Sequence, residues 1–326
     1  MVKKVKAISL LSGGLDSILA VKVLMEQGIE VTGLTFVSPF FGSANGERAA
    51  AQLGIELIVR DISCEVMDLV RRPPHGYGKQ LNPCIDCHAL MIREAGILAR
   101  EKGYDFIATG EVLGERPMSQ NRQSLDTVAR DSGCADILLR PLSAKLLPPT
   151  KPEKDGLVDR EKLLAIEGRS RKPQMELARK FGIKKYMQPA GGCLLTDPAF
   201  CTRLSELMRS EPDFSIADVE LLKLGRHFRL PSGAKVIVGR DKKDNDKITS
   251  ACAQGDSLIT SDIVPGPVVL LKRSQSSSDI EFAARVCASY SDHEGREIDM
   301  ELYVNGGRTR IKANPSPREE FQDIKI

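Results

Sequence analysis

The first 140 residues alternate short apolar segments with helical segments, and this alternation constrains the fold more than any other feature of the chain. Apolar stretches typical of buried strands lie at 5–11, 31–37, 55–59, 106–109 and 137–139. Helical patterns occupy 15–27, 47–53 and 86–102, and each is followed by a glycine that can end a helix. Strands and helices that alternate at this spacing form a parallel sheet with helices on both faces. We therefore predict an α/β fold for this part.

The pattern changes further along the chain. Pro148-Pro149-Thr150-Lys151-Pro152 interrupts the alternation, and helices are expected at 160–166, 172–181 and 198–208. Later elements are expected as strands at 234–238, 268–271, 300–304 and 309–312, and as a helix at 280–289. Asn305-Gly306-Gly307 predicts a hairpin between the last two strands. We expect a domain at 1–196, a helical linker at 197–215 and a smaller α+β domain at 216–326.

The composition is that of a globular protein that contains more than one domain. The chain has 326 residues, of which 41% are hydrophobic and 28% charged, and its net charge is only +3. No run of 18 apolar residues is present, so we expect no membrane span and a cytoplasmic location. In a reducing compartment, the eight cysteines are expected to be buried thiols, metal ligands or catalysts rather than disulfides.

Positive charge is concentrated in one stretch. Residues 140–185 contain 13 Lys/Arg and 6 Asp/Glu, although the whole chain is nearly balanced. Such a stretch forms either solvated helix faces or a surface that contacts the phosphates of a nucleic acid. Charge alone favours neither interpretation.

The segment Ser12-Gly13-Gly14-Leu15-Asp16-Ser17 connects the first predicted strand to the first helix, where an open α/β sheet binds its ligands. Glycines allow close approach of a phosphate, and the amides at a helix start favour an anion. The hydroxyl groups of Ser12 and Ser17 can donate to the same oxygens. The carboxylate of Asp16 would repel a bare phosphate, but Mg²⁺ can bridge the two. No Lys-Ser/Thr follows, so this is not a Walker A loop.

Three cysteines form a second candidate site. Cys84 and Cys87 form a C-x-x-C at a predicted helix start, where the helix dipole is expected to lower the thiol pKa. Cys193 follows Gly191-Gly192 on a loop. Three thiolates suit a [4Fe–4S] cluster with one open iron, or zinc with His88 or another group as fourth ligand. A catalytic pair that carries and resolves a persulfide is the third interpretation. The remaining cysteines, 64, 134, 201, 252 and 287, are interpreted as small core residues.

The loop Ser12–Ser17 resembles the S-G-G-x-D-S signature of PP-loop ATP pyrophosphatases. This resemblance implies an adenine nucleotide alpha hydrolase-like fold, with ATP and Mg²⁺ at the loop and adenylation of a carbonyl oxygen. Asn82-Pro83-Cys84-x-x-Cys87 resembles a stretch of the tRNA thiolation enzymes in that group, of the 2-thiouridylase and 4-thiouridine synthetase types. The resemblance makes Asp16, Cys84 and Cys193 candidate catalytic residues. It makes Cys84, Cys87 and Cys193 candidate ligands of a cluster, and retention of both pair cysteines favours the cluster.

Thr109-Gly110-Glu111, with Gly114, Ser119 and Gln120, resembles the T-G-E-x-x-G…S-Q stretch of 4-thiouridine synthetases. The resemblance places Thr109 and Gly110 in the nucleotide pocket, where small residues are expected to leave room for the ligand. Arg140-Pro141-Leu142 and Gly168-Arg169-Ser170-Arg171 continue the likeness. Lys145, Arg169 and Arg171 are candidates for phosphate or tRNA contacts.

The C-terminal part resembles the NFACT RNA-binding domain rather than the appended domains of known thiolation enzymes. The segments that carry this likeness are 238–246, 265–269 and 283–291. The resemblances together imply an ATP-dependent tRNA thiouridylase that receives sulfur from sulfide or a persulfide carrier. Whether the chain forms a homodimer is left open by the sequence. The alternatives are a PP-loop activator of a small molecule, and a non-catalytic RNA-binding or sulfur-trafficking protein. The modified uridine and its carbonyl are not indicated.

Overall fold

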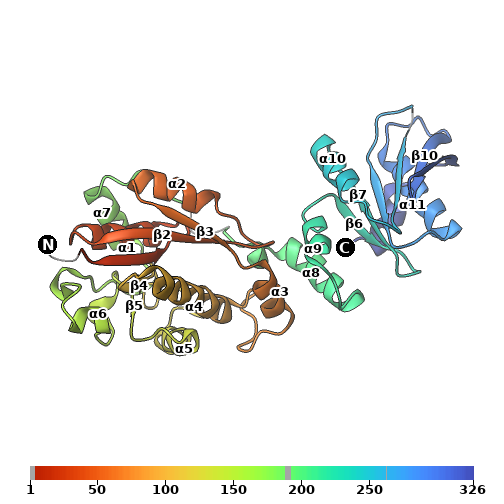
Figure 1. Cartoon of the computed structure of the whole chain (residues 1–326). Coiled ribbons are helices and arrows are strands. Elements are labelled where there is room, and N and C mark those ends of the chain that lie inside the picture. Colours follow the sequence, from red (N-terminus) through yellow and green to blue (C-terminus); the bar gives the residue numbers. More distant parts are fainter. Residues whose placement is uncertain (1–3, 188–191, 262) are drawn as a thin grey trace. The chain divides into compact units, whose positions relative to one another are not determined.

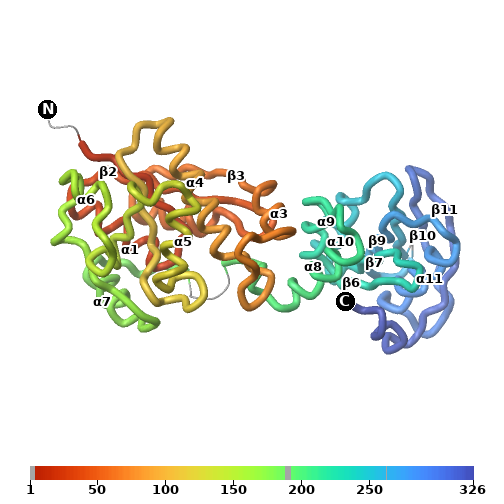
Figure 2. Tube along the Cα trace, turned by 90° about the horizontal axis from the view of Figure 1, so that it is seen from below, coloured from red at the N-terminus to blue at the C-terminus, as the bar shows by residue number. Residues whose placement is uncertain are grey.

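A computed structural model describes residues 4–187, 192–261 and 263–326. The chain divides into two compact units, Met1–Asp197 and Pro198–Ile326, each of which is described here by itself (Figures 1 and 2). Residues from Pro198 onward, which we expected to form a linker up to residue 215, belong to the second unit.

The first unit is built on a five-stranded sheet in the order β3-β2-β1-β4-β5, and all neighbouring strands are parallel. The strands are β1 (Lys6–Leu10), β2 (Glu30–Val37), β3 (Leu57–Asp61), β4 (Phe106–Ala108) and β5 (Leu138–Leu139). Because β2 and β4 lie on opposite sides of β1, the loops that leave β1 and β4 separate at the carboxyl edge of the sheet. Such a switch point is where open α/β sheets bind ligands.

Helices cover both faces of this sheet, as predicted, with α2 and α7 on one side and α4 and α5 on the other (Figure 1). The helices are α1 (Leu15–Met25), α2 (Ala44–Leu53), α3 (Ser63–Arg71), α4 (Cys84–Lys102), α5 (Arg122–Ser132), α6 (Lys151–Lys154) and α7 (Lys172–Lys180). Short 3₁₀ segments are η1 (Ala144–Leu146), η2 (Arg160–Lys162) and η3 (Leu194–Thr196). The helix α1 packs against α2 and α7, whereas α4 packs against β1, β4 and α5.

The structure differs from the sequence-based expectations at several places in the first unit. The helix expected at 160–166 is wrong, because only the 3₁₀ segment η2 forms there and the chain is extended at Leu163. The helices α3 and α5 were not predicted from the sequence. The helix α5 is largely polar, with only Leu125 and Val128 as buried apolar side chains, so its apolar stripe is too narrow to stand out. The helix α3 is short and buries Val66, Met67 and Val70.

The second unit contains a six-stranded antiparallel sheet in the order β11-β10-β8-β9-β7-β6. Its strands are β6 (Arg226–Arg229), β7 (Lys235–Val238), β8 (Ser257–Ser261), β9 (Val269–Lys272), β10 (Ile298–Val304) and β11 (Gly307–Ala313). Its helices are α8 (Pro198–Ser210), α9 (Ile216–Leu221), α10 (Lys242–Ser250) and α11 (Ser277–Tyr290), with the 3₁₀ segment η4 (Arg318–Ile324). The hairpin between β10 and β11 is confirmed, and its turn residues Asn305 and Gly306 both have positive φ, as a type I′ turn requires.

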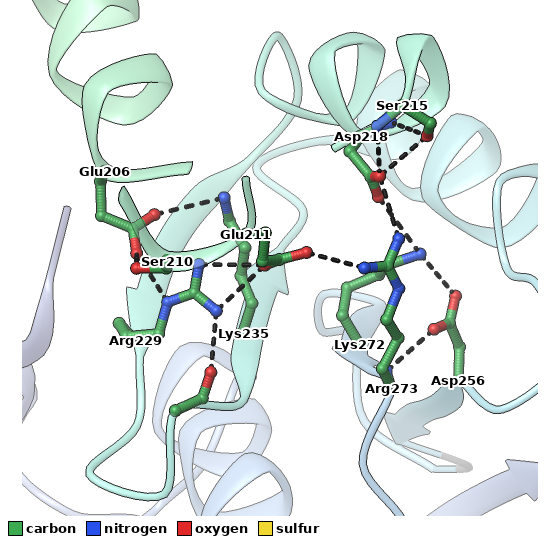
Figure 3. Close-up of polar contacts among 11 residues, drawn as sticks. Glu206, Ser210, Glu211, Ser215, Asp218, Arg229, Lys235, Asp256, Lys272 and Arg273 are labelled. Carbon is green, nitrogen blue, oxygen red and sulfur yellow. Dashed lines mark hydrogen bonds and ion pairs between the residues drawn. The ribbon is translucent and has the colours of Figure 1, made fainter. Parts of the chain in front are cut away.

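Ion pairs attach the first helices of the second unit to its sheet (Figure 3). Arg229 of β6 bonds Glu206 of α8 at 2.6 Å and Glu211, just after α8, at 3.1 Å. Arg273 bonds the same Glu211 at 3.0 Å and Asp218 of α9 at 3.0 Å. These bonds tie α8 and α9 to the sheet, so the segment around residue 210 is a fixed part of this unit.

The apolar cores contain mainly Leu, Ile, Val and Ala, as expected for a chain without Trp. The second unit adds aromatic contacts, with Phe321 packed edge-on against Phe228 and Phe282 at ring distances of 6.5 and 5.7 Å. Within the described ranges, no helix has the length and apolar composition that a membrane span requires.

Candidate active site

The loop between β1 and α1 leaves the first amides of the helix available to a ligand. Gly14 is the N-cap residue of α1, and no side chain caps the helix. The hydroxyl of Ser17 donates to the Gly14 carbonyl at 2.8 Å and lies 3.4 Å from the hydroxyl of Ser12. The two serines therefore shape the loop, while the uncapped amides and the helix dipole favour an anion there.

Gly13 and Gly14 contact segments that are distant in the sequence. Gly13 has φ +81°, and a Cβ atom there would lie 2.4 Å from the carbonyl oxygen of Asn45 at the start of α2. Gly14 pairs with Met187 as a parallel β-bridge, and the Met187 amide donates to the Gly13 carbonyl at 3.1 Å. Only glycine fits at position 13, because the site demands both an unusual backbone and close approach.

Gly110, two residues after β4, touches the same loop from the other side. A Cβ atom at position 110 would lie 2.5 Å from the Ser17 backbone nitrogen and 2.6 Å from the Asp16 carbonyl carbon. We expected small residues here to leave room for a nucleotide. At Gly110 that room is instead filled by the backbone of the loop, so the glycine supports the loop directly.

Polar groups without partners gather around Asp16. Four of the ten buried side-chain polar atoms that lack a hydrogen bond in the described chain belong to three residues of this region: Asp16 Oδ1, Arg171 Nε, and Nε2 and Oε1 of Gln174. Gln174 is completely buried in the first turn of α7. A buried amide without partners costs about 1–3 kcal/mol, so such a concentration indicates a site completed by a ligand.

Electrostatics link the same residues. Burial raises the pKa of Asp16, against the opposing effects of Arg171, the Gln174 side chain and Arg116. Burial and then the charge of Asp16 raise the pKa of Glu115. A carboxylate oxygen without a partner, close to cationic side chains, suits Mg²⁺ bound together with phosphate oxygens. The residues present therefore fit magnesium with a polyphosphate.

A buried ion network joins the loop region to the cysteine helix. The carboxylate of Glu111 bonds Arg140 Nε at 2.8 Å and His88 Nδ1 at 2.9 Å, and accepts from the Thr109 hydroxyl at 3.1 Å. Burial alone would raise the pKa of Glu111, but Arg140 and His88 outweigh it and lower the pKa to about 2. His88 follows Cys87 in α4, so Glu111 holds the cysteine helix beside Gly110.

The three cysteines gather around Cys87. Cys84 begins α4, and its sulfur accepts a hydrogen bond from Asn82 Nδ2 at 3.1 Å. Burial, followed by the neighbouring thiols of Cys193 and Cys84, raises the pKa of Cys87 far above its ordinary value. The expected lowering by the helix dipole is therefore wrong for Cys87, because desolvation and neighbouring sulfur outweigh it. Gly191 lies outside the described residues.

The thiol set suits soft metals or an iron–sulfur cluster in its chemistry. Within the described ranges, however, no three His, Cys, Asp or Glu side chains are already arranged to hold a metal ion. His88, considered as a fourth zinc ligand, turns one ring nitrogen to Glu111. Of the remaining cysteines, Cys134, Cys201 and Cys287 are buried as expected. Cys252, two residues after α10, is half-buried and packs against a small apolar cluster of the second unit. Cys64 is exposed in the first turn of α3, so its prediction as a core residue is wrong.

The three basic residues that were candidates for phosphate or tRNA contacts lie in different surroundings in the structure. Lys145 forms an ion pair with Glu161 at 3.2 Å, Arg169 is exposed, and Arg171 lies beside Asp16. Sequence reasoning missed Glu115 and Gln174. Only one signal could have revealed Gln174: its place on the apolar face of α7, together with Ala178 four residues later.

The fold and the site define a class of protein in which a parallel α/β unit has a glycine-containing loop at its switch point and an antiparallel α+β unit follows it in the chain. Residues 3–145 match the family described as "Thiamine biosynthesis protein (ThiI)". Residues 225–324 match the family described as "NFACT protein RNA binding domain". The predicted resemblances to PP-loop tRNA thiolation enzymes and to the NFACT RNA-binding domain are thereby confirmed.

Curated relatives agree with the first match. The tRNA-specific 2-thiouridylase MnmA of Trichlorobacter lovleyi is 30% identical over 150 residues, 42% of this chain and 42% of that protein. The enzyme of the same name from Chloroflexus aurantiacus is 33% identical over 120 residues, 31% of this chain and 33% of that protein. The chain thus matches 33% and 42% of the length of these two relatives.

Solved structures give weaker likenesses. A 4-thiouridine synthetase–RNA complex with bound ATP is 22% identical with a TM-score of 0.37, covering 66% of this chain and 52% of that chain. The C-terminal part of a fibronectin/fibrinogen-binding protein from Streptococcus suis is 14% identical with a TM-score of 0.29, covering 48% and 76%.

Proposed function

We propose that this protein is an ATP-dependent tRNA sulfurtransferase that replaces a uridine carbonyl oxygen with sulfur. We call the loop from Ser12 to Ser17 the phosphate loop. One observation carries the proposal: Gly110 contacts this loop, while the adjacent Glu111 holds His88 beside the cysteine pair. A loop suited to phosphates and a set of thiols are thereby fixed to the same dipeptide. The matches of residues 3–145 and 225–324 support thiolation and RNA binding.

In the proposed reaction, the amides of α1 and the loop glycines bind the triphosphate of ATP, and Asp16 faces its Mg²⁺. The uridine carbonyl oxygen attacks the α-phosphorus, the bond to the pyrophosphate oxygen breaks, and the loop amides stabilise the leaving charge. The target base must leave its stack to reach the loop. The adenylated carbon is then open to a sulfur nucleophile.

Cys84 and Cys193 are the proposed sulfur carriers. If the sulfur arrives as a cysteine persulfide, its terminal sulfur attacks the activated carbon and AMP leaves with the original oxygen. The second thiol then takes the place of the transferred sulfur, which leaves a disulfide that an external thiol must reduce. A [4Fe–4S] cluster, if bound, would be held by Cys84, Cys87 and Cys193 and would supply hydrosulfide at its open iron.

The decisive experiment is nucleoside mass spectrometry of tRNA from cells with and without the gene. Loss of one thiouridine in the deletion strain, restored by the parent gene but not by Asp16→Ala, supports the proposal. Unchanged thiouridines would contradict it. Release of pyrophosphate without RNA but with a small carbonyl substrate would favour a small-molecule activator instead.

Three further parts of the proposal have separate tests. Iron and sulfide analysis after anaerobic reconstitution distinguishes a cluster from a persulfide mechanism. Incubation with labelled sulfide or with a persulfide-loaded carrier identifies the chemical class of the sulfur donor. Light scattering on the purified chain tests the proposed homodimer, and fractionation tests the proposed cytoplasmic location.

A further inference from the structure

The basic stretch 140–185 consists of two parts with different electrostatic character. In 140–162, five of the six Lys/Arg side chains form ion pairs: Arg140, Lys145, Lys151, Arg160 and Lys162. The segment 169–185 contains seven Lys/Arg residues and one acidic residue, Glu176. Six of these seven are exposed: Arg169, Lys172, Arg179, Lys180, Lys184 and Lys185. We call these six the α7 cationic surface, and among the residues that the structure describes none of the six has an ion-pair partner.

Three residues of the α7 cationic surface, Lys172, Arg179 and Lys180, are exposed side chains of α7, and the other three lie in the segments just before and just after this helix. The buried residues of α7 are Gln174 and Ala178, and the helix packs against α1. At one end of the surface, Arg171 lies beside Asp16. At the other end, Met187, two residues after Lys185, pairs with Gly14. The surface therefore flanks the loop at both ends.

The repulsion among these unpaired cations lowers the stability of the folded protein unless a polyanion binds to them. Charges of one sign that gather on one surface repel one another, and most basic residues in the preceding stretch are neutralised by acids. Among large apolar side chains in 169–185, only Met175 is exposed, at 43%. A surface that is strongly cationic and offers one apolar contact suits a phosphate backbone better than a lipid layer or a protein groove.

We propose that the α7 cationic surface binds the phosphate backbone of a folded RNA and guides its target base to the adjacent phosphate loop. This proposal rests on the proposed function, because it identifies where the tRNA substrate contacts the first unit. RNA contacts made by the second unit would add to the RNA affinity that this surface provides.

The test measures the binding of a tRNA transcript to the full-length chain as a function of NaCl concentration. The variant K180A/K184A/K185A removes three charges from the surface. The matched control K151A/K154A/K162A removes three charges from the neighbouring stretch, where two of the three side chains are already paired. Each phosphate contact contributes roughly 0.7–0.9 to the slope of log K against log[salt]. We expect the test variant to lose roughly tenfold in affinity and about 2 in slope, and the control to match the parent.

A photo-crosslinking experiment gives an independent readout. Met175→p-benzoylphenylalanine places a crosslinker within the surface, and the same change at Val59 places one on β3, at a residue that is 48% exposed. We expect tRNA to crosslink at 175 and not at 59. Equal slopes for parent and test variant, or no crosslink at 175, would overturn the proposal. If the slope falls but no thiouridine depends on the gene, then the surface binds RNA and the proposed chemistry fails.

Discussion

Gly110 and Ser17 lie so close that a Cβ atom at position 110 would stand 2.5 Å from the Ser17 backbone nitrogen. This contact fixes the start of α1 against the end of β4. The position of the phosphate loop therefore depends on a residue 93 positions later in the chain.

Gly110→Ala is expected to displace the loop, since neither backbone can yield cheaply. Overpacking of this kind costs about 1–3 kcal/mol, and we expect ATP affinity to fall at least roughly tenfold. Isothermal titration with ATP and Mg²⁺ measures the change. Gly42→Ala is the matched control, because its added methyl group would meet nothing within 4 Å. Parent-like affinity for Gly110→Ala would show that the contact does not matter.

Gln174→Met is expected to separate stability from function. The apolar side chain replaces a buried amide that has no partners, so the free energy of unfolding should stay level or rise. ATP affinity should fall roughly tenfold, because the ligand loses an amide that faces Asp16. Denaturant unfolding and nucleotide titration give the two values. Gln27→Met, at the opposite end of α1, should leave ATP affinity unchanged. A Gln174→Met variant that binds ATP like the parent would limit Gln174 to a structural role.

Glu111→Gln is expected to destabilise the first unit by about 3 kcal/mol, because Arg140 would remain buried without its carboxylate. Urea unfolding measures this change. Glu161→Gln removes an exposed partner of Lys145 and should cost less than about 1 kcal/mol. The pKa of Glu111 is lowered to about 2. The stabilisation that the ionised Glu111 gives to the folded state is therefore complete above the ordinary pKa of Glu and is lost as pH falls toward 2. Similar losses for the two variants would contradict this assignment.

His227 makes the second unit sensitive to acid. It is 1% exposed, its Nε2 donates to the Leu224 carbonyl at 2.7 Å, and burial followed by the charge of Lys235 lowers its pKa to about 3. Below the ordinary pKa of 6.5, His227 is protonated in the unfolded chain but stays neutral in the folded chain. The free energy of unfolding therefore falls as pH falls from 6.5 toward 3. At pH 5 this loss is about 2 kcal/mol.

His227→Gln keeps a donor for Leu224 but cannot be protonated. We expect the difference in unfolding free energy between pH 7 and pH 5 to be about 2 kcal/mol smaller in this variant than in the parent. Chemical unfolding of the full-length chain at the two pH values measures it. An identical pH dependence in both proteins would show that His227 does not resist protonation.

Much of the fold was predictable because local patterns and tertiary structure agree. The strands β1, β2 and β4, the helices α1 and α4, and the hairpin at Asn305 all have strong periodicity or turn chemistry. The helix α5 escaped prediction because its burial rests on two apolar side chains, and the expected helix at Arg160 failed because the chain there is extended after three residues.

In the site, the sequence predicts residues whose chemistry is tied to a local motif, such as Asp16 and the cysteine pair. It does not predict residues that become important only through packing. Gln174 becomes buried because α7 lies on α1. Gly110 was predicted as a residue of the pocket, but its contact with the backbone of the loop after β1 follows only from the packing. The raised pKa of Cys87 likewise comes from burial and then from the charge of Cys193, which lies more than 100 residues later.

The bridge between Gly14 and Met187 also sets a local concentration. Cys193 lies six residues beyond Met187, and six residues span at most about 20 Å. A thiol that stays within this distance of the loop is present there at an effective concentration of at least about 50 mM, whatever the amount of protein in solution. If Cys193 carries sulfur as proposed, transfer of that sulfur to an activated base at the loop is unimolecular in practice.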